Sequence, residues 1–459
     1  MPIVAGVDSS TQSVKVVLRD ADSGELVAST SRPHPDGSEV NPQHWWKALS
    51  EALDELSSHK ISAISIAGQQ HGMIALDKDG AVIRDALLWN DTRSDKAAED
   101  LNREIPDIAL RTGSQLVASF TASKVRWLAD SEKANANRVA AIALPHDWLS
   151  WKLSGAKSIE TLFTDRSDAS GTGYFDSRKN EYCLDILATA IRTNQEIILP
   201  KIIAPNQFGT TSTNSIPIAA GAGDNAGAAL GLGASLGDLV ISLGTSGTAF
   251  AISKSSTHDS SGEVAGFADA TGNFLPLACT LNAAKIFNTV AKSLSLSFEE
   301  FSSLALSAKV GAEGLRIIPH FDGERTPNKP SAKGSFYGIT HSNFTRENIA
   351  RASIEGVIAG MIYAARAVER QGVSYSRILL IGGAAKNSAV QQISADLFGR
   401  TIHIPPIGEY VADGAAKQAA WALSGKDEVP KWSLGEIRAI APKNPGPEIV
   451  EDYMELISS

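Results

Sequence analysis

Gly221-Ala222-Gly223-Asp224-Asn225-Ala226 lies between the apolar run 216–220 and the small-residue stretch 227–233. This order predicts a strand, then a glycine-lined turn, then the start of a helix, where a ligand can approach the backbone closely. A helix N-terminus also favours an ionised carboxylate, so Asp224 is predicted to accept a proton from an alcohol. The plain alternative is a helix N-cap, for which Asp is a preferred residue.

The same six residues formally satisfy the dinucleotide fingerprint G-x-G-x-x-G/A. Asp224, however, would place a negative charge where a pyrophosphate should meet the helix N-terminus. No acidic residue ends a second strand about 20 residues further on, as ribose recognition requires. The P-loop pattern G-x-x-x-x-G-K-[S/T] is also absent from the chain. Dinucleotide binding of the Rossmann type and P-loop chemistry are therefore both rejected.

Two similar strand–turn–strand motifs occur, one in each half of the chain. Residues 3–18 are predicted to form two strands around a polar turn, and residues 240–252 repeat that layout around Gly244-Thr245-Ser246-Gly247. At the same offset, Thr11 of the first motif aligns with Thr245 of the second. A motif repeated at matched positions indicates a duplicated domain.

Helix and strand segments alternate after each motif, at 41–67 in the first half and at 348–381 in the second. The helix at 348–371 carries an apolar stripe with a period of 3.6 residues. Such alternation predicts an α/β fold in each half. We place the boundary near Gly237, which gives domains of residues 1–236 and 237–459.

The turns of the two motifs are suited to phosphate, because backbone amides and hydroxyls can donate hydrogen bonds to phosphate oxygens. Magnesium binds through one or two carboxylates together with substrate phosphates, so Asp8, at the end of the first strand, is the predicted metal ligand. A single turn of this kind would more simply be an Asx-type turn, but two copies favour a functional role. The predicted phosphate contacts are Ser10, Thr11, Gly244 and Thr245.

A third glycine-containing turn, Gly382-Gly383-Ala384-Ala385-Lys386-Asn387, follows the apolar strand 378–381. Its small residues leave room for a flat aromatic base, and the Asn387 amide can form a hydrogen bond to such a base. The alternative is a tight turn between a strand and a helix, without a ligand.

The totals narrow the class of protein. The chain has 459 residues, of which 43% are apolar and 20% charged, and a formal net charge of −9. This acidic balance argues against a nucleic-acid partner. No uninterrupted apolar stretch reaches the ~18 residues of a membrane-spanning helix, so no membrane partner is expected. Cys183 and Cys279 lack the spacing of a disulfide framework or a zinc site, which is typical of a cytoplasmic protein.

Longer patterns in the chain resemble the FGGY family of carbohydrate kinases, within the actin-like ATPase superfamily. Residues 119–130 (SFTASKVRWLAD) are similar to the first signature of that family, and residues 334–356 to the second. The resemblance covers nearly the whole chain. These long spaced patterns are more specific than any single glycine turn.

Within the family the chain is most similar to the xylulokinases. Residues 68–73 (GQQHGM) resemble their sugar-binding segment, in which Gln70 here replaces a Met, and residues 88–94 (LWNDTRS) resemble their tryptophan segment. The segments 167–172 and 323–327 are also similar. Glycerol kinases carry Arg-Glu in place of Gln-His, which disfavours glycerol as the substrate. In the first turn, Ser9-Ser10 stands where many members have an x-Gly pair.

The resemblance implies an α/β fold of two actin-like (ribonuclease H-like) lobes, with a cleft for ATP and sugar between them. It implies a phosphotransferase with an alcohol group as acceptor, which uses ATP and Mg²⁺ to convert D-xylulose to D-xylulose 5-phosphate. Asp224 is then the catalytic base and Asp8 the metal ligand. The expected sugar contacts are Gln70, His71, Trp89 and Asn225, and the expected ATP contacts, beyond the two phosphate turns, are Gly382, Gly383, Ala384 and Asn387.

Three alternatives stay open. The sugar could be another ketose or a sugar alcohol, because one or two hydroxyl contacts decide such a preference. The chain could be an actin-like switch ATPase, although such a protein has no need of the polyol pocket at Gln70, His71 and Trp89. A catalytically inactive sugar sensor would need neither Asp8 nor Asp224. The resemblance also suggests a homodimer.

Overall fold

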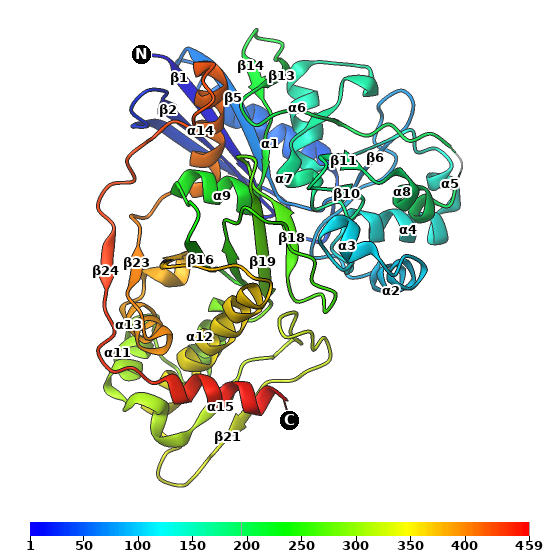
Figure 1. The fold of residues 1–459 in the computed structure, drawn as a ribbon. Helices are drawn as coiled ribbons and strands as arrows, with labels where there is room; N and C mark the ends of the chain where they lie inside the picture. Colours follow the sequence, from blue (N-terminus) through cyan, green and yellow to red (C-terminus); the bar gives the residue numbers. More distant parts are fainter. Residues whose placement is uncertain (194, 459) are drawn as a thin grey trace.

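Two mixed β-sheets form the centres of two lobes in the computed structural model, which describes residues 1–193 and 195–458 (Figure 1). The first sheet has the order β13 (Phe208–Thr211), β14 (Pro217–Ala219), β5 (Ile61–Gly68), β1 (Ile3–Ser9), β2 (Ser13–Asp20) and β3 (Leu26–Pro33), and β15 (Ala222–Gly223) also pairs with β5. The second has the order β18 (Ala265–Ala268), β19 (Phe274–Thr280), β17 (Gly247–Ala251), β16 (Asp238–Leu243), β22 (Arg377–Ile381), β23 (Ile402–Ile404) and β24 (Arg438–Ile440). The predicted α/β class is confirmed.

The two sheets repeat one arrangement. In the first, β1 pairs antiparallel with β2 and parallel with β5. In the second, β16 pairs antiparallel with β17 and parallel with β22. The strand–turn–strand motifs predicted from the sequence are therefore the same structural unit, and the expected duplication is confirmed.

Helices cover both sheets and extend the first lobe. Those before the second sheet are α1 (Pro42–Glu55), α2 (Asp95–Glu104), α3 (Ile108–Thr112), α4 (Thr121–Ser131), α5 (Lys133–Ala136), α6 (Pro145–Ser154), α7 (Arg166–Ala169), α8 (Leu184–Ile191) and α9 (Asp224–Leu232). Those after it begins are α10 (Ala284–Ser293), α11 (Phe298–Ser307), α12 (Arg346–Arg370), α13 (Ser388–Phe398), α14 (Tyr410–Ser424) and α15 (Pro447–Ser458). None of the helices in the described residues is long and apolar enough to cross a membrane.

Short two-stranded ribbons connect these elements. They are β4 (Glu39–Val40) with β7 (Ala86–Leu87), β6 (Ile74–Leu76) with β8 (Ala141–Ala143), β9 (Phe163–Thr164) with β12 (Lys201–Ile202), β10 (Phe175–Asp176) with β11 (Glu181–Tyr182), and β20 (Arg316–Ile318) with β21 (Ser335–Tyr337). Most of the ribbon strands belong to the first half of the chain, where they connect the helices that widen the first lobe.

The helix α14 crosses from the second half of the chain to the first sheet, as Figure 1 shows beside β1 and β5. Its alanines join Val4, Val17 and Ala63 in one buried cluster. The side chain of Gln418 accepts a hydrogen bond from Ser65 Oγ at 2.6 Å. The first sheet is thus covered on one face by residues that the sequence alone assigns to the second domain.

Glycines let α14 approach α9 closely. A Cβ added at Gly414 would lie 1.9 Å from the carbonyl oxygen of Gly227, and one added at Gly231 would lie 2.0 Å from that of Tyr410. Real Cβ atoms do not approach a carbonyl oxygen so closely. The two helices therefore cross backbone to backbone, between the two sheets.

Candidate active site

The carboxyl ends of three parallel strands meet at one edge of the first sheet and carry two carboxylates. Asp8 pairs with Ala67 between β1 and β5, and Ala67 pairs with Ala222 between β5 and β15. Asp224 follows two residues after Ala222, as the first residue of α9. Since neighbouring strands lie about 4.8 Å apart, the backbones of the two aspartates are separated by roughly 10 Å.

Two glycines shape the turn before Asp224. Gly221 has a φ of 89°, and a Cβ there would lie 2.8 Å from the carbonyl oxygen of Ile66. A Cβ at Gly223 would lie 2.6 Å from Nε2 of Gln70. Only glycine allows this turn to lie against β5 and Gln70, and the approach of a ligand to it stays a prediction.

Asp224 is half-buried at the N-terminus of α9. Its Oδ1 accepts hydrogen bonds from the backbone nitrogen of Asn225 at 2.7 Å and from its side-chain Nδ2 at 2.8 Å. Burial raises the pKa of Asp224 to about 6, although both bonds oppose this shift, and no basic side chain contributes to it. A carboxylate with this pKa is mostly ionised at neutral pH and still basic enough to take a proton.

Asp8 is buried at the end of β1, and its Oδ1 has no hydrogen-bond partner within the described chain. Burial raises its pKa to about 7; the Lys15 ammonium lowers it and the Asp224 carboxylate raises it further. Lys15 is the residue opposite Asp8 in the hairpin, and its Nζ also lies 2.7 Å from Oε2 of Glu409. The Oδ1 atom of Asp8 is thus a buried oxygen that could bind a cation in addition to the nearby Lys15 ammonium.

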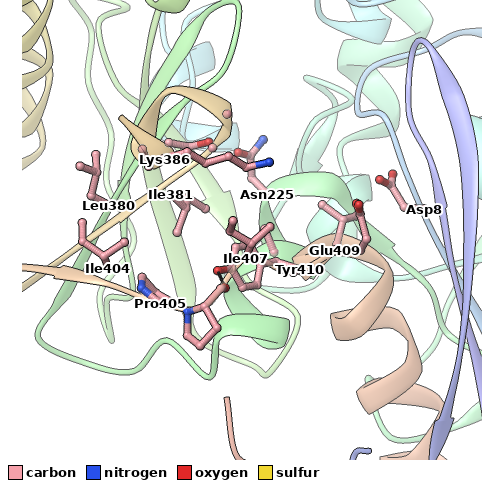
Figure 2. A pocket seen from close by; sticks show the side chains of 18 of the residues that line it. Asp8, Asn225, Leu380, Ile381, Lys386, Ile404, Pro405, Ile407, Glu409 and Tyr410 are labelled. Carbon is pink, nitrogen blue, oxygen red and sulfur yellow. Dashed lines mark hydrogen bonds between the residues drawn. The ribbon is translucent and has the colours of Figure 1, made fainter. Parts of the chain in front are cut away.

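A cavity of about 780 Å³ lies next to both aspartates, between the two sheets. Figure 2 shows Asp8 towards one end, with Leu380 and Ile404 at the other. Ile407 and Tyr410 line the middle part. The cavity therefore has an acidic end where the first sheet contributes Asp8, and an apolar stretch at Leu380 and Ile404 that Arg438 and Glu436 border.

The predicted turn at Gly382 forms part of the cavity wall. Gly382 has a φ of 94°, and a Cβ there would lie 2.6 Å from the carbonyl oxygen of Leu243. A Cβ at Gly383 would meet no atom within 4 Å. Gly382 thus packs against the end of β16, whereas Gly383 leaves open space for a ligand. Ala384 is buried and is not among the lining residues.

Asn387 does not take part in this wall. Its Oδ1 accepts hydrogen bonds from the backbone nitrogens of Ala389 and Val390, as the N-cap of α13. Its Nδ2 donates to Ser302 Oγ. The amide is thus held as the cap of α13, and the hydrogen bond expected between Asn387 and a base stays a prediction. Gln391 and Lys386, which were not predicted, line the cavity instead.

Neither predicted phosphate turn belongs to the cavity wall, although both border it. In the first, Ser10 Oγ donates to the carbonyl oxygen of Ser13 at 3.1 Å, and Thr11 accepts a hydrogen bond from Trp89. In the second, the carbonyl oxygens of Gly244 and Thr245 accept hydrogen bonds from Ala284 and Ala283, at the start of α10. Each turn follows a strand that contributes a cavity residue near its end. The first turn comes after Asp8 in β1, and the second comes after Ser242 in β16.

The predicted sugar residues gather on the first lobe beside Asp224. Gln70 lies against Gly223 and donates from Nε2 to the carbonyl oxygen of Ser167 at 3.2 Å. Trp89 is half-buried, with its Nε1 2.9 Å from Thr11 Oγ1. Asn225 follows Asp224 and lines the cavity. This grouping leaves Asp224 between a polar wall on one side and the cavity on the other.

His71 is held in one orientation. Its Nδ1 lies 2.6 Å from the carbonyl oxygen of Gly171, and its ring packs against Phe120 and Phe267, with centroids 4.8 and 5.5 Å away. Burial lowers its pKa to about 3, despite that hydrogen bond. Neutral His71 therefore donates from Nδ1, which leaves Nε2 as a hydrogen-bond acceptor.

Some residues that shape the site were not predicted as site residues. Lys15 can be recognised as a site residue only when the register of the hairpin is known, because the register places it opposite Asp8. Ser167 and Gly171 contact Gln70 and His71 through their carbonyl oxygens, which leave no mark in a sequence.

Comparisons with known proteins agree with this geometry. Residues 3–231 match the model of the N-terminal domain of the FGGY family of carbohydrate kinases, and residues 239–423 match that of the C-terminal domain. A protein named xylulose kinase from Streptomyces coelicolor is 41% identical over 444 residues, covering 93% of this chain and 89% of its own.

Solved structures are similar over the full length. The structure of a xylulose kinase from Bifidobacterium adolescentis has a TM-score of 0.92 and 41% identity, and covers 99% of both chains. That of a gluconate kinase from Lactobacillus acidophilus has a TM-score of 0.88 at 25% identity, and covers 100% of this chain and 96% of its own. The same two-lobed architecture is thus found in proteins named for different sugar substrates.

Proposed function

The chain belongs to the FGGY family of carbohydrate kinases, and we propose that it transfers the γ-phosphoryl group of ATP to a terminal hydroxyl of D-xylulose, giving D-xylulose 5-phosphate. The choice of sugar rests on relatives that carry the name xylulose kinase at 41% identity over almost the whole chain. It also rests on Gln70, whose amide keeps one N–H beyond the bond to Ser167, and on His71, whose Nε2 can accept a hydrogen bond from a polyol.

One observation carries the proposal for the reaction. Asp224, a carboxylate with a pKa of about 6, lies beside Gln70 and lines a cavity that has Asp8 at one end and an apolar stretch at Leu380 and Ile404. The base of ATP is flat and mostly apolar, so it fits the stretch at Leu380 and Ile404. The phosphates would lie towards Asp8, where a bound Mg²⁺ would offset their repulsion from the carboxylates.

In the proposed mechanism the sugar lies on the first lobe and Asp224 accepts the proton of its terminal hydroxyl. The resulting oxygen nucleophile attacks the γ-phosphorus in line, and ADP leaves. His71 orients the sugar by accepting a hydroxyl hydrogen bond at Nε2. Phosphoryl transfer depends on positioning and electrostatics more than on covalent help from the protein. Closure of the lobes about the α9–α14 crossing excludes water, which would otherwise hydrolyse ATP.

The residues present fit a magnesium ion at Asp8. The buried Oδ1 of Asp8 is unpartnered, and carboxylate oxygen is the ligand that Mg²⁺ prefers. Within the described residues, no group of three or more His, Cys, Asp or Glu side chains forms a metal cage, which suits an ion held largely by phosphates and water. When bound, Mg²⁺ would supply positive charge to the phosphates of ATP. Asp8 would hold it directly or through water.

The proposal is tested by coupled ADP release over D-xylulose, L-xylulose, D-ribulose, L-ribulose, glycerol and gluconate. The highest kcat/KM is expected for D-xylulose. A higher value for another sugar would move the assignment to that substrate. ADP release that does not respond to any of the six would favour a switch ATPase.

Two further parts of the proposal concern the setting of the enzyme. We propose a cytoplasmic location, which the two free cysteines Cys183 and Cys279 support. A homodimer is also proposed on the family resemblance, and sedimentation of the purified protein tests it.

A further inference from the structure

The imidazole of His146 is completely buried behind the turn that leads to Asp224. It is the second residue of α6. A Cβ built on Gly221 would lie 2.5 Å from its Nδ1, and one built on Gly68 would lie 3.2 Å from its Cβ. His146 therefore touches both the end of β5 and the glycine turn that sets the direction of α9.

Three carboxylates surround this one ring. Its Nε2 lies 3.2 Å from Oδ2 of Asp168, 3.3 Å from Oδ1 of Asp147 and 3.5 Å from Oδ1 of Asp165. All four side chains are buried. Burial disfavours the charged form of His146, but the carboxylates outweigh it and raise its pKa to about 9. The surrounding carboxyl groups therefore favour the imidazolium form of His146.

Two of these residues, Asp165 and Asp168, belong to a segment that touches the active site at three points. We call residues 165–171 the sugar platform. Its Ser167 accepts a hydrogen bond at Oγ from the backbone nitrogen of Gly223, and one at its carbonyl oxygen from Gln70. The carbonyl oxygen of Gly171 accepts the hydrogen bond from His71. The platform thus fixes both polar sugar residues and the backbone immediately before Asp224.

We propose that His146 is a positioning residue for phosphoryl transfer, which pins the sugar platform and the Gly221 turn together and so sets where Asp224 meets the sugar. This inference rests on the proposed function, because it names a residue that serves the same site. His146 does not touch the cavity and acts only through Ser167, Gly171 and the turn.

The positive charge of His146, and not only its volume, is needed in this role. Asp165 caps α7, the first part of the platform, by accepting hydrogen bonds from the backbone nitrogens of Ser167 and Asp168. Asp147 accepts one from the backbone nitrogen of Leu144. Without the imidazolium, the buried carboxyl groups of Asp147, Asp165 and Asp168 would face one another, and no other cation in the described part of the chain forms an ion pair with them. The platform would then move so that a carboxylate reaches solvent, or one of the carboxyl groups would take up a proton.

The first experiment measures steady-state kinetics of His146→Gln with D-xylulose and ATP. The KM for the sugar should rise at least tenfold and kcat should fall, while the KM for ATP stays within twofold. Adding Asp147→Asn should recover at least half of the change in sugar KM on a logarithmic scale, because it removes one of the carboxylates that lost the histidine as partner. His320→Gln, at a buried histidine bonded to Tyr453 in the other lobe, is the matched control and should leave the sugar KM unchanged.

An unchanged sugar KM in His146→Gln would overturn the proposal, as would a loss that Asp147→Asn does not repair. A second measurement uses the wild-type protein, so it does not depend on the folding of a variant. Nitrogen-15 NMR of histidine-labelled wild-type protein should show one buried imidazole with both nitrogens protonated at pH 7.5, and a neutral ring at His146 would equally refute the role. If the wild type phosphorylates none of the sugars but retains this signal, the proposed function fails while the charged cluster stands.

Discussion

The indole Nε1 of Trp89 donates a hydrogen bond to Thr11 Oγ1 across 2.9 Å, and this bond joins the sugar wall to the first phosphate turn. Thr11 Oγ1 in turn lies 3.3 Å from Oε1 of Gln69, beside Gln70. The two substrates of the proposed reaction would therefore be positioned by one connected set of side chains.

Trp89→Phe should loosen the sugar-binding residues and the first phosphate turn, because it removes the hydrogen bond that joins them. A neutral hydrogen bond contributes about 1 kcal/mol, so the KM for the sugar should rise roughly fivefold, with a smaller fall in kcat. Thr11→Val removes the same bond from the other side, and the double variant should be little worse than either single one. Trp127→Phe, at a tryptophan stacked on Arg84 and Arg93, is the control. Additive losses in the double variant would show that the bond is not what matters.

Asp224→Asn keeps the shape of the side chain but removes its basicity. General-base catalysis contributes roughly 10²–10⁴-fold, so kcat should fall by that range. The dissociation constant of ATP, measured by calorimetry, should stay within about threefold because the nucleotide contacts are unaltered. A kcat within tenfold of the wild-type value would show that Asp224 is not the catalytic base.

The pH profile tests the same residue without a substitution. Burial raises the pKa of Asp224 from its usual value to about 6, and only the ionised form accepts a proton. With MgATP saturating, so that Asp8 is held in the carboxylate form that binds Mg²⁺, the kcat/KM for the sugar should fall tenfold per pH unit below about pH 6 and be level just above it. A profile that stays level down to pH 4.5 would mean that the acting base is not a carboxyl of raised pKa.

Asp8→Asn should stabilise the protein while abolishing turnover. The folded state raises the pKa of Asp8 to about 7, so it binds a proton more tightly than the unfolded chain does. This contribution to stability is complete below about pH 4 and is lost as the pH rises through 7. At pH 8, without Mg²⁺ or nucleotide, the free energy of unfolding should rise by roughly 2–4 kcal/mol in the Asn variant.

Chemical denaturation at pH 5 and pH 8 measures this effect. The difference between wild type and Asp8→Asn should be large at pH 8 and should shrink at pH 5, because the wild-type carboxyl is then mostly protonated. An equal difference at both values would assign the stabilisation to something other than ionisation. Excess Mg²⁺ should narrow the gap at pH 8 by binding only the carboxylate form.

Gly414→Ala should separate the two crossing helices. Its Cβ would meet the carbonyl oxygen of Gly227 at 1.9 Å, and overpacking of this kind costs about 1–3 kcal/mol or more. Thermal unfolding should show the loss, and kcat should fall because the lobes no longer close correctly. Gly227→Ala is matched to it, since its Cβ would lie no closer than 3.3 Å to a neighbour. Equal stability of the two variants would contradict the close crossing.

The hairpins and the strands that follow them could be predicted because their signals are local. Apolar runs bounded by polar turns identified residues 3–18 and 240–252, and the structure extends these only slightly. The helix predicted at 348–371 is found at 346–370. The repeat then predicted the relation between the two sheets.

Contacts between distant segments could not be predicted in this way. Ser65 and Gln418 are 353 positions apart, and no local pattern indicates that α14 covers the first sheet. The cluster at His146 needs three segments to converge, so the sequence shows only a histidine beside an aspartate. Asn387 has a strong local signal as the N-cap of α13, and this capping role was not predicted.

The return of α14 to the first sheet has a consequence for synthesis on the ribosome. When residue 236 has emerged, every strand of that sheet exists, but Val4, Val17 and Ala63 still lack their cover. The nascent half-chain keeps an apolar face in water until nearly two hundred further residues have been translated. Chaperone capture of truncated chains should thus persist up to the point where α14 leaves the exit tunnel and cease beyond it.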